Sequence, residues 1–113
     1  MDHFRSFEIE ALMLLGAEIL GEALVNAVVR DAEFVSYDYS GVGYCLTVRH
    51  HHLPSTRIVL HEPMVLGRVG EMLGSYLAFV EHHELMLEYA GFADVPDNIR
   101  DLDVQVEVQA NAT

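Results

Sequence analysis

Residues 76–89, YLAFVEHHELMLEY, contain the clearest strand–turn–strand pattern of the chain. Two runs rich in aromatic and aliphatic residues, 76–80 and 85–89, flank the polar segment 81–84. Runs of this kind on either side of a short polar segment are typical of a β-hairpin. The sequence therefore predicts an antiparallel hairpin here, with the other elements arranged around it.

Further strands are predicted on both sides of this hairpin, because hydrophobic residues recur at every second position. Residues 34–39 and 42–48 are expected to form two strands joined by a tight turn. Residues 57–61 are predicted to form a short strand that ends at a Glu-Pro pair, and 64–72 an extended segment bent at its glycines. Residues 102–108 alternate most regularly and predict a half-buried strand.

The N-terminal part of the chain has a different period, since hydrophobic residues recur at spacings of three and four between residues 6 and 31. This spacing predicts a long amphipathic helix, with Ser6 as its cap. Gly16 and Gly21 each weaken a helix by roughly 1 kcal/mol relative to Ala. They either allow a close approach of the sheet or divide the helix in two.

These elements predict one α+β domain over residues 1–113, with a long N-terminal helix packed on a mostly antiparallel sheet of about five to seven strands.

The charge of the chain is strongly unbalanced, with 18 Asp and Glu against 6 Arg and no Lys, a net charge of −12. Such a field repels the phosphates of nucleic acids and of anionic lipid surfaces, so neither is an expected partner. A basic protein would be attracted and its association accelerated. The alternative is that the charge only keeps a small protein soluble.

Cysteine content and hydropathy together predict a cytoplasmic protein outside the membrane. Cys45 is the only cysteine, so no internal disulfide can form. The N-terminus lacks the basic region of a signal peptide. Glu18 and Glu22 interrupt the hydrophobic stretch 11–29, and each is costly in hydrocarbon.

The histidines are candidate ligands of a transition metal, because imidazole suits Zn²⁺ and Ni²⁺. They cluster in segments 50–52 and 82–83. Neighbouring residues of a strand point to opposite faces, so a site needs one ring from each segment, such as His51 and His83. The alternative is that these side chains are simply solvated.

No catalytic residue and no cofactor is predicted. Cys45 lies in the middle of a predicted strand, where a thiol is usually structural. The glycines at 41 and 43 open a strand, whereas those of a dinucleotide-binding motif open a helix.

Two groups of side chains are candidates for contact with a protein partner. The first is an acidic cluster near the C-terminus, Asp94, Asp97, Asp101 and Asp103, which is alternatively a solvated loop. The second comprises tyrosines, Tyr37 and Tyr39 in particular, because a tyrosine combines a large apolar ring with a polar tip. A row of tyrosines on a sheet face left open by the helix would suit a partner or a homodimer.

Two segments resemble a family of short, uncharacterised bacterial proteins. Residues 34–44 are similar to its V-S-x-x-x-T-G-x-G-F motif, and residues 74–89 to its G-x-G-F-x-L-F-V-x-D-G-x-L-x-x-L-E-G-Y hairpin, whose Asp-Gly is replaced here by His-Glu. The resemblance covers about residues 33–103. It implies a small cytoplasmic α+β protein with no assigned enzyme activity. Some short acidic proteins of this kind look like immunity proteins, which neutralise toxins by direct binding.

The sequence thus predicts a non-enzymatic acidic protein-interaction domain that binds a basic partner as immunity proteins do. The alternative is a metal- or small-ligand-binding domain that uses the histidines of 50–52 and 82–83.

Overall fold

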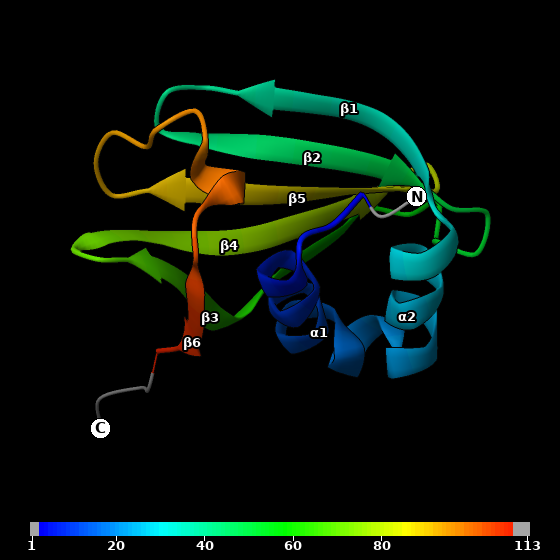
Figure 1. The fold of residues 1–113 in the computed structure, drawn as a ribbon. Helices are drawn as coiled ribbons and strands as arrows, with labels where there is room; N and C mark the ends of the chain where they lie inside the picture. The colour runs from blue at the N-terminus through cyan, green and yellow to red at the C-terminus, as the bar shows by residue number, and fades with distance from the viewer. Residues whose placement is uncertain (1–2, 110–113) are drawn as a thin grey trace.

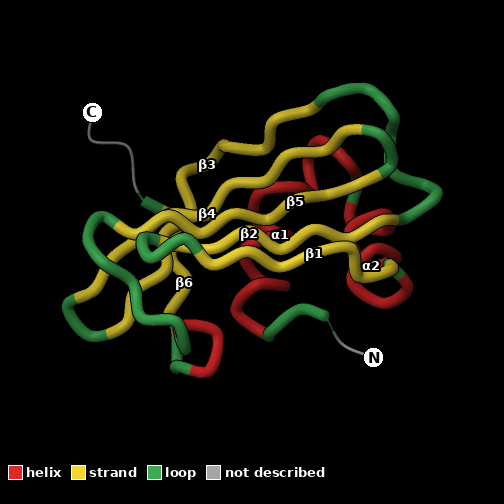
Figure 2. The backbone as a smooth tube through the Cα atoms, turned by 90° about the horizontal axis from the view of Figure 1, so that it is seen from above, coloured by secondary structure: helices red, strands yellow, loops and turns green. Residues whose placement is uncertain are grey.

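The chain folds into two layers, a pair of helices and a six-stranded sheet, in the computed structural model, which describes residues 3–109 (Figure 1). Both helices pack on the same side of the sheet, as the two views in Figures 1 and 2 show. In chain order the elements are α1 (Ser6–Leu20), α2 (Glu22–Asp31), β1 (Glu33–Tyr39), β2 (Gly43–Arg49), β3 (Ile58–Val69), β4 (Met72–Glu81), β5 (Glu84–Gly91), a 3-10 turn η1 (Ile99–Asp101) and β6 (Gln105–Val108).

The helical region predicted over 6–31 forms two helices, one of the two alternatives left open by its glycines, and the break lies at Gly21. This residue has a φ of +91°, which a residue with a Cβ rarely adopts, and α2 starts directly after it. Gly16 has the other role. A Cβ there would lie 3.2 Å from Val25 Cγ2 and 3.6 Å from Leu60 Cδ1, so the missing side chain lets α1 approach both α2 and the sheet. Ser6 lies inside α1 and does not cap it; Arg5 precedes the helix.

The sheet is antiparallel throughout, in the order β1-β2-β5-β4-β3-β6. The predicted hairpin 76–89 is confirmed as its centre, formed by β4 and β5 with Glu81 opposite Glu84. The two turn residues are therefore His82 and His83, not the His-Glu pair expected from the family motif. Both have positive φ, 54° and 63°, as a two-residue hairpin turn of this hand requires.

The strand predicted to end at Glu62-Pro63 instead continues as β3 to Val69. The ladder with β4 is irregular between Leu60 and Val65, and β6 pairs with β3 only from Val65 to Arg68. Pro63 therefore lies where no ladder hydrogen bond depends on its missing N–H. The C-terminal strand is shorter than predicted, because β6 begins only at Gln105.

The cross-strand register divides the sheet residues between two faces. Leu46, Leu87, Ala78 and Leu60 are paired in one row, are fully buried and face the helices. Tyr37 is paired with Leu46, and the other four tyrosines form a second row on the same side. Three of these four are buried, and Tyr39 at the edge strand is 41% exposed. The predicted row of tyrosines on an open face is therefore wrong. The opposite face, on which no helix packs within residues 3–109, is called the open face below.

Candidate partner-binding surface

Every arginine of the chain forms an ion pair with a carboxylate. Five of these pairs join side chains that are at least partly exposed, and the sixth joins Arg100 to the buried Glu8. The six pairs are Arg5–Asp101, Arg30–Asp31, Arg49–Glu84, Arg57–Glu81, Arg68–Glu107 and Arg100–Glu8. Because no lysine is present, the other carboxylates have no cationic Lys or Arg left to pair with. The excess negative charge is thus not compensated within the chain.

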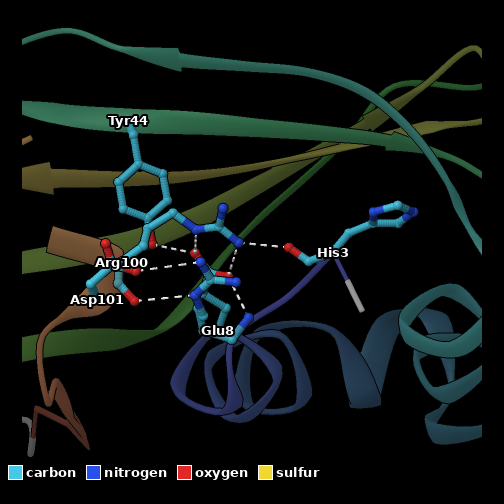
Figure 3. A network of polar contacts seen from close by, with 6 residues as sticks. His3, Glu8, Tyr44, Arg100 and Asp101 are labelled. Atoms are coloured by element: carbon cyan, nitrogen blue, oxygen red, sulfur yellow. Dashed lines mark hydrogen bonds and ion pairs between the residues drawn. The ribbon is translucent and has the colours of Figure 1, made fainter. Parts of the chain in front are cut away.

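The pair between Glu8 and Arg100 is the centre of a buried polar network (Figure 3). Glu8 is fully buried in the first turn of α1, and its Oε1 accepts a hydrogen bond from the backbone N–H of Arg5 at 2.7 Å. Arg100, in η1, donates to both carboxylate oxygens of Glu8 at 2.8 Å. Tyr44 Oη donates to Oε2 at 2.5 Å, and Arg100 also donates to the carbonyl of His3 at 2.6 Å. The network joins the start of α1 to β2 and η1.

Burial and hydrogen bonding shift the pKa values of the groups around Glu8. Burial lowers the pKa of Arg100, but its hydrogen bonds and attraction to Glu8 outweigh burial and raise it overall. Burial raises the pKa of Tyr44, and the neighbouring Glu8 raises it further. Arg100 is therefore charged and Tyr44 neutral at any physiological pH, and both act as donors to the carboxylate.

This network fixes the loop that carries the acidic cluster. Val95 and Ile99 are buried on either side of Pro96, and the backbone N–H of Val95 donates to the carbonyl of Gly41 at 2.9 Å. Tyr39 Oη donates to the carbonyl of Val95. With Arg100 held by Glu8, the loop is attached to the turn after β1 at one end and to α1 at the other. The backbone of the loop is consequently fixed before any partner arrives.

The acidic cluster predicted from the sequence is only partly free. Asp94, Asp97 and Asp103 are exposed and form no ion pair within the described part of the chain. Asp101, by contrast, pairs with Arg5 at 3.5 Å. This pair is exposed and adds little stability, because water screens it.

The two predicted tyrosines are placed differently from one another. Tyr39 is partly exposed beside the acidic loop, through its contact with Val95. Tyr37 is half-buried; its ring lies 5.5 Å from that of Tyr44 and 5.3 Å from the guanidinium carbon of Arg100. Tyr37 therefore supports the buried network, whereas Tyr39 lies at the surface.

Two exposed hydrophobic residues next to the acidic loop were not predicted. Phe92 is 63% exposed and Val42 is 51% exposed. The backbone N–H of Gly91 donates to the carbonyl of Val42 at 2.7 Å, which holds the two segments together. Phe92 follows the last strand of the hairpin directly, and that position was the only signal in the sequence. We call Tyr39, Val42, Phe92, Asp94 and Asp97 the acidic end.

The histidine segments 50–52 and 82–83 meet at the opposite end of the sheet. The backbone N–H of His82 and His83 donate to the carbonyls of Ser55 and Pro54, both at 3.1 Å, and thereby hold the hairpin turn against the loop after β2. His51 and His83 line one hollow of about 410 Å³ together with Asp31 and Glu33. Within residues 3–109, however, no three His, Cys, Asp or Glu side chains are grouped to hold a metal ion.

Hydrogen bonds set the roles of two of these histidine rings. His83 Nδ1 lies 2.6 Å from the carbonyl of Leu53, which makes it the protonated nitrogen and leaves Nε2 with a free lone pair. His50 is buried, and its Nδ1 accepts from the backbone N–H of His52 at 3.1 Å. Burial also lowers the pKa of His50, so this ring is neutral at neutral pH. His83 is thus oriented to bind a ligand, and His50 is structural.

Cys45 lies half-buried in β2 with its Sγ 3.5 Å from a carboxylate oxygen of Glu88. Burial, followed by the charge of Glu88, raises the pKa of the thiol to about 11. The thiol therefore stays protonated at neutral pH, which opposes a role as nucleophile.

Two further findings concern membrane-spanning helices and similarity to known proteins. The longest helix, α1, has 15 residues, and no helix within residues 3–109 is long and apolar enough to cross a membrane. No family model matches the chain, and neither a curated protein nor a solved structure is detectably similar to it.

Proposed function

We propose that this chain is a non-enzymatic acidic interaction domain that binds a basic protein partner in the cytoplasm, as immunity proteins do. The observation that supports the proposal is that no arginine is left to pair with the excess carboxylates. All six are engaged in ion pairs within the chain, so the remaining carboxylates present an uncompensated negative surface. Such a surface attracts a positively charged partner and repels nucleic acids.

The acidic end is the surface best suited to this partner. Phe92 offers an exposed aromatic ring of the kind that dominates binding energy at protein interfaces. Asp94 and Asp97 lie in the same loop, exposed and unpaired within residues 3–109. A basic partner would thus find an apolar anchor beside carboxylates that are exposed and not engaged in an ion pair within residues 3–109.

The attachment of the loop strengthens this proposal, because ordering a loop on binding costs free energy. An immobilised side chain alone costs about 0.5–1.5 kcal/mol. Here Val95, Ile99 and the pair between Arg100 and Glu8 fix the loop in the free protein. The partner therefore meets a loop whose backbone is already ordered, and only the exposed side chains remain to be immobilised on binding.

Capture of partners from the source organism's lysate in about 0.05 M and 0.5 M NaCl tests the proposal, because salt screens exposed charges. We expect a basic protein that is retained at low salt and released at high salt. In calorimetric titration with that protein, F92A/D94N/D97N should weaken binding by about tenfold or more.

The matched control is E18Q/E22Q. It removes two exposed carboxylates outside the acidic end, one near the end of α1 and one at the start of α2. It should change the Kd by no more than about twofold. Binding that is independent of salt, or that is weakened equally by the control, contradicts the proposal.

A second candidate function is binding of a metal ion or small ligand at the histidine end. The observation that favours it is the hollow shared by His51 and His83, with His83 Nε2 left free by the bond of Nδ1 to the Leu53 carbonyl. Water would supply the remaining ligands, because no carboxylate is grouped with the two rings within residues 3–109.

Titration with ZnCl₂ followed by calorimetry tests this candidate. We expect one saturable site that H51A/H83A abolishes, because imidazole nitrogens are the strongest ligands in the hollow. H61A, which removes an exposed histidine from β3, should leave the titration unchanged. Equal titrations of the wild type and H51A/H83A would exclude the site.

A further inference from the structure

The open face of the sheet carries hydrophobic side chains that take no part in the core. Val59, Phe79 and Met86 form one cross-strand row, and Leu73 and Leu77 lie on the same face of β4. None of the five belongs to the buried core cluster or to the hydrophobic side chains packed against it. Monomeric proteins rarely expose a contiguous apolar surface of more than a few hundred Å². The open face therefore has the composition of an interface.

Arginines and carboxylates are also paired one to one over part of the open face. A hollow of about 290 Å³ lies over Thr47, Phe79 and Met86, with Arg57, Glu81 and Glu84 among its lining residues. Arg57 Nη1 lies 3.6 Å from a Glu81 oxygen, and Arg49 pairs with Glu84 at 2.6 Å. Arg68 and Glu107 form a third pair near the far edge of the same face, at 2.9 Å. Half of the arginines of the chain therefore lie on the open face.

The size of the open face is adequate for a dimer. Six strands spaced about 4.8 Å apart, each about seven residues long at about 3.4 Å per residue, make a flat area of about 700 Å². A standard protein interface buries about 800 Å² on each partner. Stacking of two such sheets face to face thus covers the area that a specific but modest dimer needs.

We propose that the open face is the interface with a second copy of this chain. A basic partner is attracted by the unpaired carboxylates of the acidic end. It is not attracted in the same way by the open face, where arginines already pair with carboxylates. A second copy is repelled by those carboxylates, and it meets least repulsion where cations and carboxylates alternate. A two-fold dimer uses the same face on both copies, so each copy brings its three arginines already paired with carboxylates of its own chain.

Asp38 and Glu88, which lie on the open face without a cationic partner in the described chain, oppose this association at low ionic strength. Their mutual repulsion across the interface is screened by salt. Self-association is therefore expected to strengthen with salt. This is the opposite of the salt dependence expected for a basic partner, so failure of one proposal is distinguishable from failure of the other.

Sedimentation velocity of the full chain over a range of protein concentrations, in about 0.05 M and 0.5 M NaCl, tests the inference. We expect a monomer–dimer equilibrium that shifts towards dimer at the higher salt. V59E places a charge on the open face and should weaken the dimer at least tenfold. L14E is the matched control, because Leu14 is as exposed as Val59, at 38% each, but lies on the outer side of α1.

A dimer that is lost in V59E and kept in L14E supports the proposal. A chain that stays monomeric at every concentration and salt overturns it. A dimer that dissociates at high salt, or that is broken by L14E and not by V59E, overturns it as well. The salt series on the wild type needs no variant, so the test holds even if V59E fails to fold.

Discussion

Replacing Arg100 by methionine should lower the free energy of unfolding by about 3–5 kcal/mol, because it leaves the carboxylate of Glu8 buried without its cation. Glu8 has no exposed surface, and Arg100 supplies two of its hydrogen-bond donors. The backbone N–H of Arg5 and Tyr44 Oη remain as donors, but neither carries a positive charge. The loss is a large part of the roughly 5–15 kcal/mol that stabilises a typical domain.

Urea unfolding followed by circular dichroism and tyrosine fluorescence measures this effect, since the chain contains no tryptophan. R57M is the control, because Arg57 also pairs with a carboxylate but is 63% exposed. An exposed pair contributes about 0–1 kcal/mol, so R57M should shift the midpoint little. Equal losses in R57M and R100M would show that the buried charge is not the cause.

A double substitution separates the charge from the contacts. Gln in place of Glu8 keeps one acceptor oxygen for the Arg5 N–H. Its NH2 group can donate to Tyr44 Oη, which then acts as an acceptor, and the negative charge is removed. E8Q/R100M should therefore be more stable than R100M alone, because no uncompensated ion remains buried. The loop with Asp94 and Asp97 should exchange its amide hydrogens faster in R100M, since it loses its attachment to α1.

Adding a single methyl group at Gly74 should destabilise the protein by about 3 kcal/mol through overpacking. A Cβ at this position would lie 2.4 Å from Tyr89 Cζ and 2.5 Å from its Oη. The ring of Tyr89 is 1% exposed and lies 4.9 Å from the ring of Tyr76, and its hydroxyl donates to the carbonyl of Gly67 at 3.0 Å. It has no free space into which to move.

The same urea experiment, with Ser75→Ala as control, tests this prediction. Ser75 is the next residue of β4 and points to the open face, so its loss should change stability by only about 0.5 kcal/mol. Y89L should cost less in the G74A background than in the wild type, because the shorter side chain relieves the clash. A G74A protein as stable as S75A would disprove the close contact.

The central hairpin was predictable because its pattern is local. Two alternating runs separated by a short polar segment determine both strands, whatever else the chain does. The helix break was only half predictable: both glycines were visible, but the choice between them depends on tertiary contacts. Gly21 adopts positive φ, whereas Gly16 is held between Val25 and Leu60 from other elements.

In the candidate site, the sequence predicted only the residues whose role depends on being exposed to solvent. Asp94, Asp97 and Asp103 are exposed because carboxylates without a partner stay in water, and this holds in most folds. The buried pair was not predictable, because Glu8 and Arg100 are 92 residues apart in the chain. Phe92 is exposed through the course of the loop after β5, and its residue type alone predicts burial.

The sequence by itself determined the alternation of the strands, the α+β class and the net charge of −12, since these depend on residue order and composition alone. Only the tertiary structure decided which partner each arginine has and which sheet face the helices cover. The reason is the two-residue period of a strand: the pattern separates two faces, but packing selects the buried one. That selection buried Tyr44, Tyr76 and Tyr89 on the side that the helices cover, and it left Phe79 and Met86 on the open face.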